Sequence, residues 1–196
     1  MKTKIKAHYP HHVINDHSSD IYIADYTEQT RNASVKKGVE ITSVKPCDIK
    51  SFLIKNGKFI PFSSVIFDNK SFADDITGQT LSQCECICFS SAEYSKGPWV
   101  LFLELKYCNP YSKYQKENME EAKNQLTDTY KYYKQKGIIN NKQQCYLVVS
   151  FPFFQIPFPN FANTQTDVKN MRLNKVIFRG CTTKFQIKEQ NQPTHT

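Results

Sequence analysis

Two charged residues stand at the end of the most apolar segment of the chain. Residues 99–107 read WVLFLELKY, so that Glu104 and Lys106 follow a run of large apolar side chains. Side chains alternate between the two faces of a strand, which places Glu104 and Lys106 on the same face. Burying charges is costly unless they are paired or used. The spacing therefore predicts either a catalytic pair or a salt bridge at the end of a strand.

A further acidic residue lies in the preceding apolar segment. Residues 84–89 read CECICF, which predicts a strand with Glu85 near its start. If this strand pairs with 99–107, Glu85 approaches Glu104. Two carboxylates repel each other unless a cation lies between them, and their hard oxygen atoms suit Mg²⁺ or Mn²⁺. We expect Glu85 and Glu104 to bind the metal, and Lys106 to hold the attacking water or to stabilise charge on a phosphate.

The elements after this pair predict how it is positioned. Residues 116–136 place apolar side chains at three- and four-residue steps, with acidic residues in the first turns and lysines in the last, which is typical of a helix. Residues 145–151 (CYLVVSF) predict a buried strand. A strand, a helix and a strand in this order indicate a crossover between parallel neighbours. We expect 99–107 to be a central strand covered on both faces.

The combination resembles the PD-(D/E)xK nuclease superfamily. The match covers residues 84–151: an acidic residue in a strand, a short connection, a hydrophobic strand ending in Glu104-x-Lys106, then a helix and another strand. The resemblance implies a restriction-endonuclease-like core and Mg²⁺-dependent hydrolysis of phosphodiester bonds, of DNA rather than RNA. It also implies a site role for Gln125 in the helix. Restriction, repair and anti-phage defence are the settings it suggests.

The first acidic ligand is open to alternatives. The superfamily usually has Asp where this chain has Glu85, and Asp74 or Asp75 would also fit, at a longer distance from Glu104. We prefer Glu85 because it lies within a strand. An additional glutamate from the N-terminal part, Glu28 or Glu40, is a further candidate.

Outside this core the sequence predicts simpler segments. Residues 1–20 carry four histidines without an apolar pattern, which indicates a flexible polar leader rather than a metal cluster. Residues 21–188 form a single α/β (α+β) domain, with a mixed central sheet flanked by helices. Asn56-Gly57 predicts a β-hairpin over 51–62. Residues 151–163 alternate aromatics with proline and are a candidate dimer interface, and residues 189–196 form a polar tail.

The charge of the chain favours a polyanionic partner. Its 26 basic and 18 acidic residues give a net charge of +8. Lys131, Lys134 and Lys136 end the long helix and are candidate nucleic-acid contacts, with a solvated helix end as the alternative. Arginine occurs only at 31, 172 and 179, so we expect little direct reading of bases.

Several classes of protein are disfavoured. No apolar run approaches the length of a membrane span, and the basic N-terminus lacks the apolar segment of a signal peptide. We therefore expect a cytoplasmic protein with no membrane partner, whose seven cysteines are free thiols. Cys84, Cys86 and Cys88 should project from one face of a strand.

Two other functions stay open. The same fold with an incomplete site would be a nucleic-acid-binding or assembly subunit of a larger complex, which the replacement of the usual Asp favours. A basic protein that binds an acidic protein, as an immunity or inhibitor protein does, is the weaker alternative. If the protein is a nuclease, a homodimer would let it cut both strands of a duplex.

Overall fold

The computed structural model describes residues 1–68, 71–74, 76–91, 97–107, 115–153, 174–180 and 183–187. The helices within these ranges are α1 (Lys2–His8) and α2 (Gln115–Gln135). The strands are β1 (Ile14–His17), β2 (Ile21–Asp25), β3 (Val39–Thr42), β4 (Phe52–Lys55), β5 (Phe62–Ile66), β6 (Cys86–Ser90), β7 (Trp99–Leu105), β8 (Gln144–Ser150), β9 (Val176–Gly180) and β10 (Lys184–Gln186).

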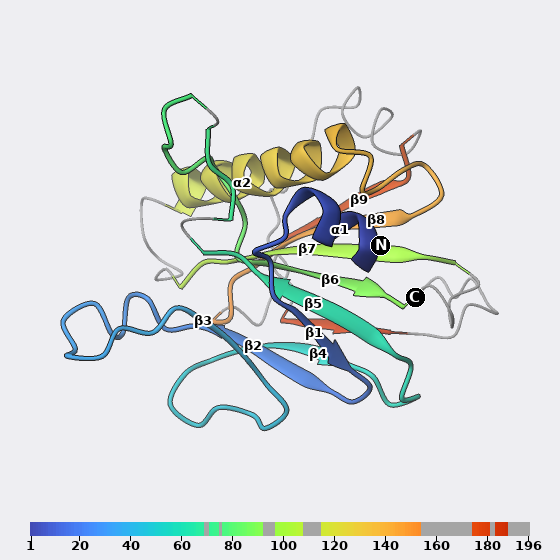
Figure 1. Ribbon diagram of the computed structural model, residues 1–196. Coiled ribbons are helices and arrows are strands. Elements are labelled where there is room, and N and C mark those ends of the chain that lie inside the picture. The colour runs from blue at the N-terminus through green and yellow to red at the C-terminus, as the bar shows by residue number, and fades with distance from the viewer. Residues whose placement is uncertain are drawn as a thin grey trace.

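The strands form two sheets in an α+β arrangement (Figure 1). A six-stranded sheet has the order β1-β5-β6-β7-β8-β9, and a four-stranded sheet has the order β10-β4-β2-β3. The helix α2 lies across one face of the six-stranded sheet, and the four-stranded sheet lies on the opposite side (Figure 1). The predicted mixed sheet is confirmed, although it is covered by a helix on one face and by a second sheet on the other.

The centre of the large sheet is the part that the sequence predicts best. β5, β6 and β7 form an antiparallel meander, and β8 follows α2 and lies parallel to β7. The register pairs Leu105 at the end of β7 with Ser150 at the end of β8. The predicted crossover is thus confirmed, and the carboxyl ends of two parallel strands meet at one edge.

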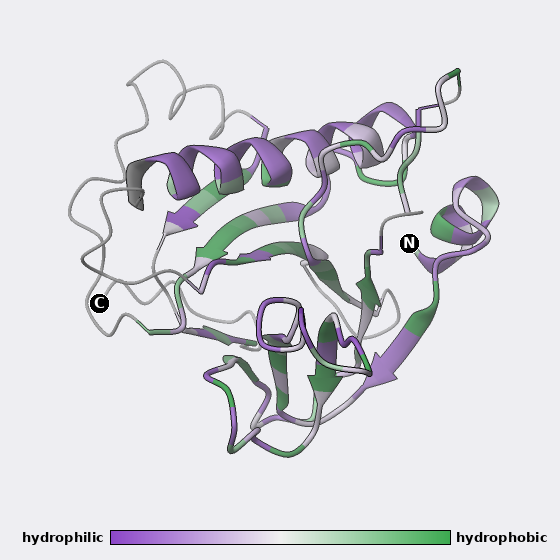
Figure 2. Cartoon of the chain, turned by 90° about the vertical axis from the view of Figure 1, so that its left-hand side faces the viewer, coloured by the Kyte–Doolittle hydropathy of each residue, from purple (hydrophilic) through white to green (hydrophobic). Residues whose placement is uncertain are grey.

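The two faces of β7 belong to two separate hydrophobic clusters. Val100 and Phe102 pack against α2, whereas Leu101 and Leu103 pack against the four-stranded sheet. Strands at the centre of Figure 2 are mainly hydrophobic, and α2 is hydrophilic along much of its length. Both observations confirm that β7 is a central strand covered on both faces.

The predicted hairpin at 51–62 is wrong. β4 pairs with β2 and β10 in the four-stranded sheet, whereas β5 pairs with β1 and β6 in the six-stranded sheet. Asn56 stabilises the connection by hydrogen bonding both the N–H and the C=O of Ile60 through its side chain. The Asn-Gly turn therefore carries the chain from one sheet to the other, because the two flanking strands pair in different sheets.

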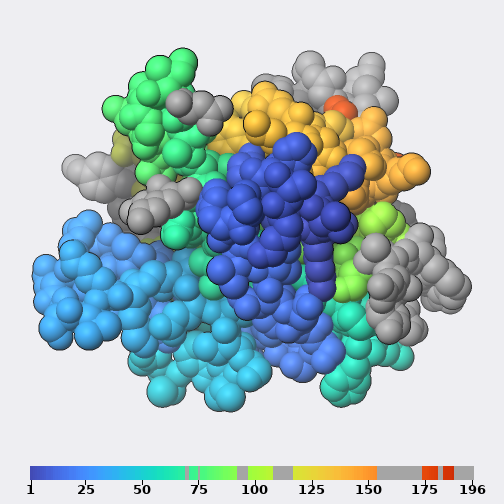
Figure 3. All heavy atoms as spheres, in the orientation of Figure 1, coloured from blue at the N-terminus to red at the C-terminus, as the bar shows by residue number. Residues whose placement is uncertain are grey.

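The first 20 residues are also more structured than the predicted leader. They contain α1 and β1, and Ile5 and His12 are almost fully buried. His12 Nε2 lies 3.1 Å from the carbonyl oxygen of Ser71, and its Nδ1 lies 3.4 Å from the hydroxyl of Tyr133. In Figure 3 this segment lies across the face turned to the viewer. Its partners are distant in sequence, so local periodicity does not predict this packing.

No described helix is both long and apolar enough to cross a membrane. The polar tail 189–196 and most of the aromatic-proline segment 151–163 lie outside the described residues, so the predicted dimer interface stays a prediction.

Candidate active site

Glu104 and Lys106 share the face of β7 that is turned toward α2. The alternation of the strand places Val100, Phe102 and Glu104 on this face, and only the last of them is charged. Glu104 is 1% exposed, although it is a glutamate. The pair therefore lies at the point where the apolar contact between β7 and α2 gives way to polar groups.

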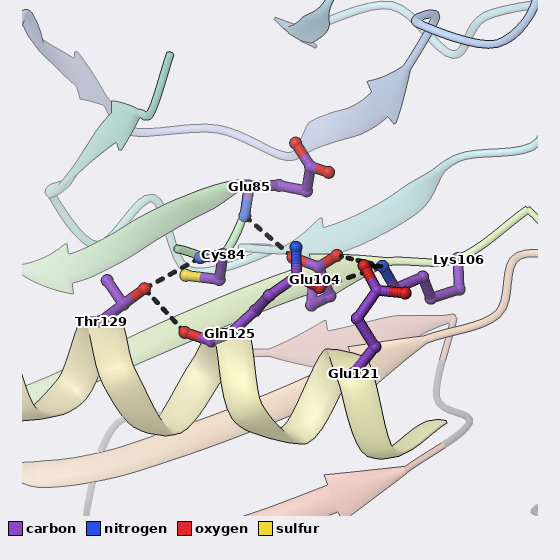
Figure 4. Close-up of polar contacts among 7 residues, drawn as sticks. All are labelled: Cys84, Glu85, Glu104, Lys106, Glu121, Gln125 and Thr129. Carbon is purple, nitrogen blue, oxygen red and sulfur yellow. Dashed lines mark hydrogen bonds and ion pairs between the residues drawn. The ribbon is translucent and has the colours of Figure 1, made fainter. Parts of the chain in front are cut away.

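Both carboxylate oxygens of Glu104 have defined surroundings (Figure 4). Oε2 accepts a hydrogen bond of 3.2 Å from the backbone N–H of Glu85. Oε1 lies 3.0 Å from Lys106 Nζ in an ion pair, but no hydrogen bond of good geometry reaches this buried atom. Glu104 is thus held on one side by the backbone that immediately precedes β6, and its other oxygen faces the Lys106 ammonium.

Lys106 Nζ lies among three side-chain oxygen atoms. It is 3.0 Å from Glu104 Oε1, it donates a 3.0 Å hydrogen bond to Gln125 Oε1, and it is 3.5 Å from Glu121 Oε1. The Lys106 side chain is 17% exposed, whereas that of Glu121 is 61% exposed. The cluster therefore opens to solvent on the side of Glu121.

The helix α2 supplies its share of these groups from one stripe. Glu121, Gln125 and Thr129 are spaced by four residues, which places them on one side of a helix. Thr129 Oγ1 accepts a hydrogen bond from the N–H of Cys84 and donates one to the carbonyl oxygen of Gln125, both at 2.8 Å. Thr129 thus ties the start of β6 to the helix that carries Gln125.

The backbone at Cys84 and Glu85 departs from regular alternation. Cys84 packs in the cluster beside α2, whereas Cys86 and Cys88 pack toward the four-stranded sheet. The prediction that the three cysteines share a face is therefore wrong. The Glu85 N–H donates to both Leu103 O, at 3.1 Å, and Glu104 Oε2, so the carboxylate of Glu104 takes part in this irregular turn of the chain.

The Glu85 carboxylate is consequently turned away from that of Glu104 (Figure 4). Burial raises the pKa of Glu85 to about 7, and the nearby Asp25 carboxylate on β2 adds to the rise, against the effect of Lys106. The structure brings the backbone of Glu85 to Glu104, as strand pairing predicts, but it directs the two carboxylates apart.

Burial and charge oppose each other within the Glu104–Lys106 pair. Burial raises the pKa of Glu104 and the Glu85 carboxylate raises it further, while Lys106 lowers it. For Lys106, burial favours the neutral amine, but Glu104 and Glu121 outweigh it and raise the pKa, so the ammonium is retained.

The remaining predicted residues lie elsewhere. Asp75 is outside the described residues. Asp74 Oδ1 accepts hydrogen bonds from the N–H groups of Ile76 and Thr77, so it caps its own turn. Glu28 pairs with Arg31, and Glu40 pairs with Lys37.

The predicted nucleic-acid contacts are at the other end of α2. At 1.5 Å per residue, Lys131 lies about 9 Å along the helix from Gln125, and Lys136 follows the last residue of α2. Lys131 pairs with Asp128 at 3.0 Å, and Lys134 donates a hydrogen bond to Asn141. These contacts place both lysines in local surface networks apart from the Glu104 cluster.

The sequence did not lead us to predict two members of the cluster, Glu121 and Thr129. Their signal was the four-residue spacing on either side of Gln125, which shows that all three share one side of the helix.

Comparisons of the chain with protein-family models, with curated proteins and with solved structures find no match. The chemistry of the site therefore has to be inferred from the arrangement of Glu104, Lys106 and their neighbours. Over the ranges that the structure describes, no three His, Cys, Asp or Glu side chains gather as a metal-binding group. The groups around Lys106 Nζ are instead two carboxylates and one amide oxygen. Oxygen atoms of this kind are the ligands of hard cations that keep several water molecules.

Proposed function

We propose that this protein is a divalent-metal-dependent nuclease that hydrolyses phosphodiester bonds of DNA. One observation carries the proposal: a glutamate that is 1% exposed is paired at 3.0 Å with a lysine at the end of the central strand. Replacing such a pair by apolar residues is often neutral or stabilising, so stability alone gives little reason for it. A catalytic role would give one.

The position of the pair supports this function. Ligands of open sheets with parallel strands bind beyond the carboxyl ends of those strands, and Glu104 and Lys106 lie at that end of β7, beside β8. Within residues 84–151, two antiparallel strands followed by a helix and a parallel strand have the order of elements on which the resemblance to the PD-(D/E)xK superfamily rests. The net charge of +8 favours a polyanion through release of its counterions.

Glu104, Lys106 and Gln125 have different roles in the proposed reaction. A bound Mg²⁺ or Mn²⁺ would activate water and neutralise charge on the phosphate. Glu104 would hold that metal with Oε1, because Oε2 is occupied by the Glu85 N–H. Lys106 would stabilise the negative charge that develops on the phosphate oxygens, and Gln125 positions the Lys106 ammonium by accepting its hydrogen bond.

Cleavage of plasmid and single-stranded DNA with Mg²⁺ or Mn²⁺ tests the proposal. Glu104→Gln and Lys106→Met should each reduce the rate at least about 100-fold. Glu120→Gln is the matched control, because Glu120 is an exposed residue of α2 that pairs with Lys123 at 2.9 Å. Cleavage that survives both site substitutions would exclude this site as the catalytic centre.

The second candidate is a nucleic-acid-binding subunit without catalytic activity. The observation that favours it is the Glu85 carboxylate, which is turned away from Glu104 and leaves the predicted carboxylate pair unformed (Figure 4). It predicts that the purified protein does not cut DNA under any metal condition. It also predicts salt-sensitive DNA binding that is unchanged in Glu104→Gln and Lys106→Met.

A further inference from the structure

The positive charge of the chain is concentrated in two short segments. Residues 1–8 and 128–143 contain seven lysines and one aspartate, which is a net charge of +6. The rest of the chain contains 19 basic and 17 acidic residues, which is a net charge of +2. The attraction to a polyanion that the composition indicates therefore comes mainly from these two segments.

The fold brings the two segments together. α1 packs against the carboxyl end of α2, where Lys4 Nζ donates a 2.7 Å hydrogen bond to the carbonyl oxygen of Gly137. Ile5 and Tyr133 are 0% exposed and belong to one hydrophobic cluster. In Figure 3 the dark blue atoms of the first residues and the orange atoms that follow the end of α2 lie side by side on one face. We call this surface the lysine face, and its members are Lys2, Lys4, Lys6, Lys131, Lys134, Lys136 and Lys142.

Nearby carboxylates neutralise little of this charge. Lys2 pairs with Asp16 at 2.6 Å, and Lys131 pairs with Asp128 at 3.0 Å. The other five lysines form no ion pair with a carboxylate among the residues that the structure describes. Three of these five donate hydrogen bonds to uncharged oxygen atoms, which hold the ammonium groups in place and leave their charge intact. The lysine face therefore attracts anions.

The lysine face is separate from the candidate active site. Glu104 lies near the carboxyl end of β7, whereas the turn after α2 leads into the amino end of β8, at the opposite edge of the sheet. At 1.5 Å per residue, Lys134 lies about 14 Å along α2 from Gln125. Successive phosphates of one strand are about 3.4 Å apart along the axis of a DNA duplex, so this separation corresponds to about four base pairs.

We propose that the lysine face binds the phosphate backbone of DNA, about four or more base pairs from the bond that the Glu104 site would cut. The choice of DNA rests on the proposed function, but the surface would serve a binding subunit without catalytic activity equally well. Lysine suits this role, because its ammonium is a point charge that contacts phosphates without reading the bases.

An anionic membrane fits the lysine face less well than DNA does. A basic helix that binds a membrane surface also inserts apolar side chains between the lipids. In α1 the apolar side chain of Ile5 is buried in the core, so the helix has no large apolar group to insert. A DNA duplex instead carries a phosphate about every 1.7 Å along its axis and can contact several lysines at once.

Binding of a fluorescein-labelled DNA duplex to the full chain tests the proposal. The duplex has about 30 base pairs, or about 100 Å, and fluorescence anisotropy is measured in EDTA so that no cleavage occurs. Lys136→Gln/Lys142→Gln removes two exposed charges from the lysine face. Lys36→Gln/Lys45→Gln is the matched control, because it removes two exposed charges from loops of the four-stranded sheet and gives the same net charge.

Substitutions in α1 test the other half of the lysine face. Lys4→Gln/Lys6→Gln removes two charges together with their contacts to Gly137 and His12, whereas Lys4→Arg/Lys6→Arg keeps the charges. A lower affinity in the glutamine variant and an affinity close to wild type in the arginine variant would show that charge is responsible. Urea unfolding confirms that each variant is folded.

We expect each glutamine variant of the lysine face to bind DNA at least about fivefold more weakly at about 100 mM salt. The slope of log K against log salt concentration should become smaller by about 2, since two phosphate contacts are lost. The control Lys36→Gln/Lys45→Gln should change the affinity less than about twofold.

Three results would overturn the proposal. The first is an equal loss of affinity in the control, because net charge alone would then account for binding. The second is the absence of DNA binding by the wild type up to about 100 µM, which is the weak end of non-specific binding. The third is tighter binding to vesicles of phosphatidylcholine and phosphatidylserine than to DNA, which would make a membrane the partner.

The failure of the lysine face and the failure of the proposed function are distinguishable. DNA binding that depends on the lysine face, by a protein that does not cut DNA, supports the surface and argues against the nuclease. Cleavage that depends on Glu104, with a DNA affinity that is unchanged in the lysine variants, supports the nuclease and overturns the role of the lysine face.

Discussion

The backbone N–H of Glu85 donates a 3.2 Å hydrogen bond to Glu104 Oε2, while the Glu85 carboxylate is turned to the other side of the strands (Figure 4). Glu85 therefore contacts Glu104 through its main chain, and its carboxylate acts on Glu104 only through its charge, which raises the pKa of Glu104. This relationship leaves Glu104 Oε1 directed at Lys106 and α2, where the candidate site lies.

The Glu104–Lys106 pair should behave as a coupled unit in stability. Lys106→Met leaves a buried carboxylate without its cation, and we expect a loss of about 3–5 kcal/mol in the free energy of unfolding. Glu104→Gln combined with Lys106→Met should restore stability to the wild-type level or above it. A double-mutant cycle by urea unfolding measures the coupling, and additive effects would contradict it.

Thr129 should stabilise the start of β6 through the Cys84 N–H. Thr129→Val keeps the shape of the side chain but leaves a buried donor without its acceptor, which should cost about 1–3 kcal/mol. Thr127→Val makes the same change at a half-buried position of α2 and should cost less than about 0.5 kcal/mol. Equal losses in urea unfolding would show that the hydrogen bond is unimportant.

His12 should make the protein less stable in acid. Burial lowers the pKa of His12 to about 4, despite the opposing effects of the Ser71 carbonyl and Asp68, while His11 and Lys6 lower it further. Because the unfolded chain binds a proton near pH 6.5 and the folded protein does not, stability falls as pH decreases from about 6.5 to 4. His12→Gln should remove about 2–3 kcal/mol of this loss, measured by urea unfolding between pH 4 and 7.5.

The control for His12 is His8→Gln, at an exposed position of α1. It should keep the wild-type dependence on pH. If His8→Gln and His12→Gln have the same profile, burial of His12 is not the source of the acid sensitivity.

Glu85 should make the protein less stable as pH rises, which is the opposite of the effect of His12. Its pKa is about 7 in the folded protein, above that of an unfolded glutamate, so the folded state binds the extra proton. Its contribution is favourable at low pH and is lost as pH rises from about 4.5 to 7. We expect Glu85→Gln to be more stable than wild type by about 2 kcal/mol at pH 8, with little difference at pH 4.5.

Unfolding by urea at both pH values tests this, with the exposed Glu28→Gln as the control. A variant that is less stable than wild type at pH 8 would mean that the Glu85 carboxylate contributes favourably when charged.

The sequence by itself determined the elements around β7. The apolar run 99–105, the helical periodicity of 116–136 and the apolar run 145–151 are local patterns, and each produced the predicted strand or helix. The alternation of a strand also determined that Glu104 and Lys106 share a face, and the order of the elements determined that β8 is parallel to β7.

The tertiary structure alone decided which groups meet there. The backbone at Cys84 and Glu85 is irregular, because the Glu85 N–H donates to both Leu103 O and Glu104 Oε2. The Glu85 carboxylate is therefore turned away from that of Glu104. The packing of α2 on β7 brought Glu121 to Lys106, and the two sheets separated the strands on either side of Asn56. Such outcomes depend on contacts between distant segments, whose free energies outweigh the local preferences that a sequence pattern reports.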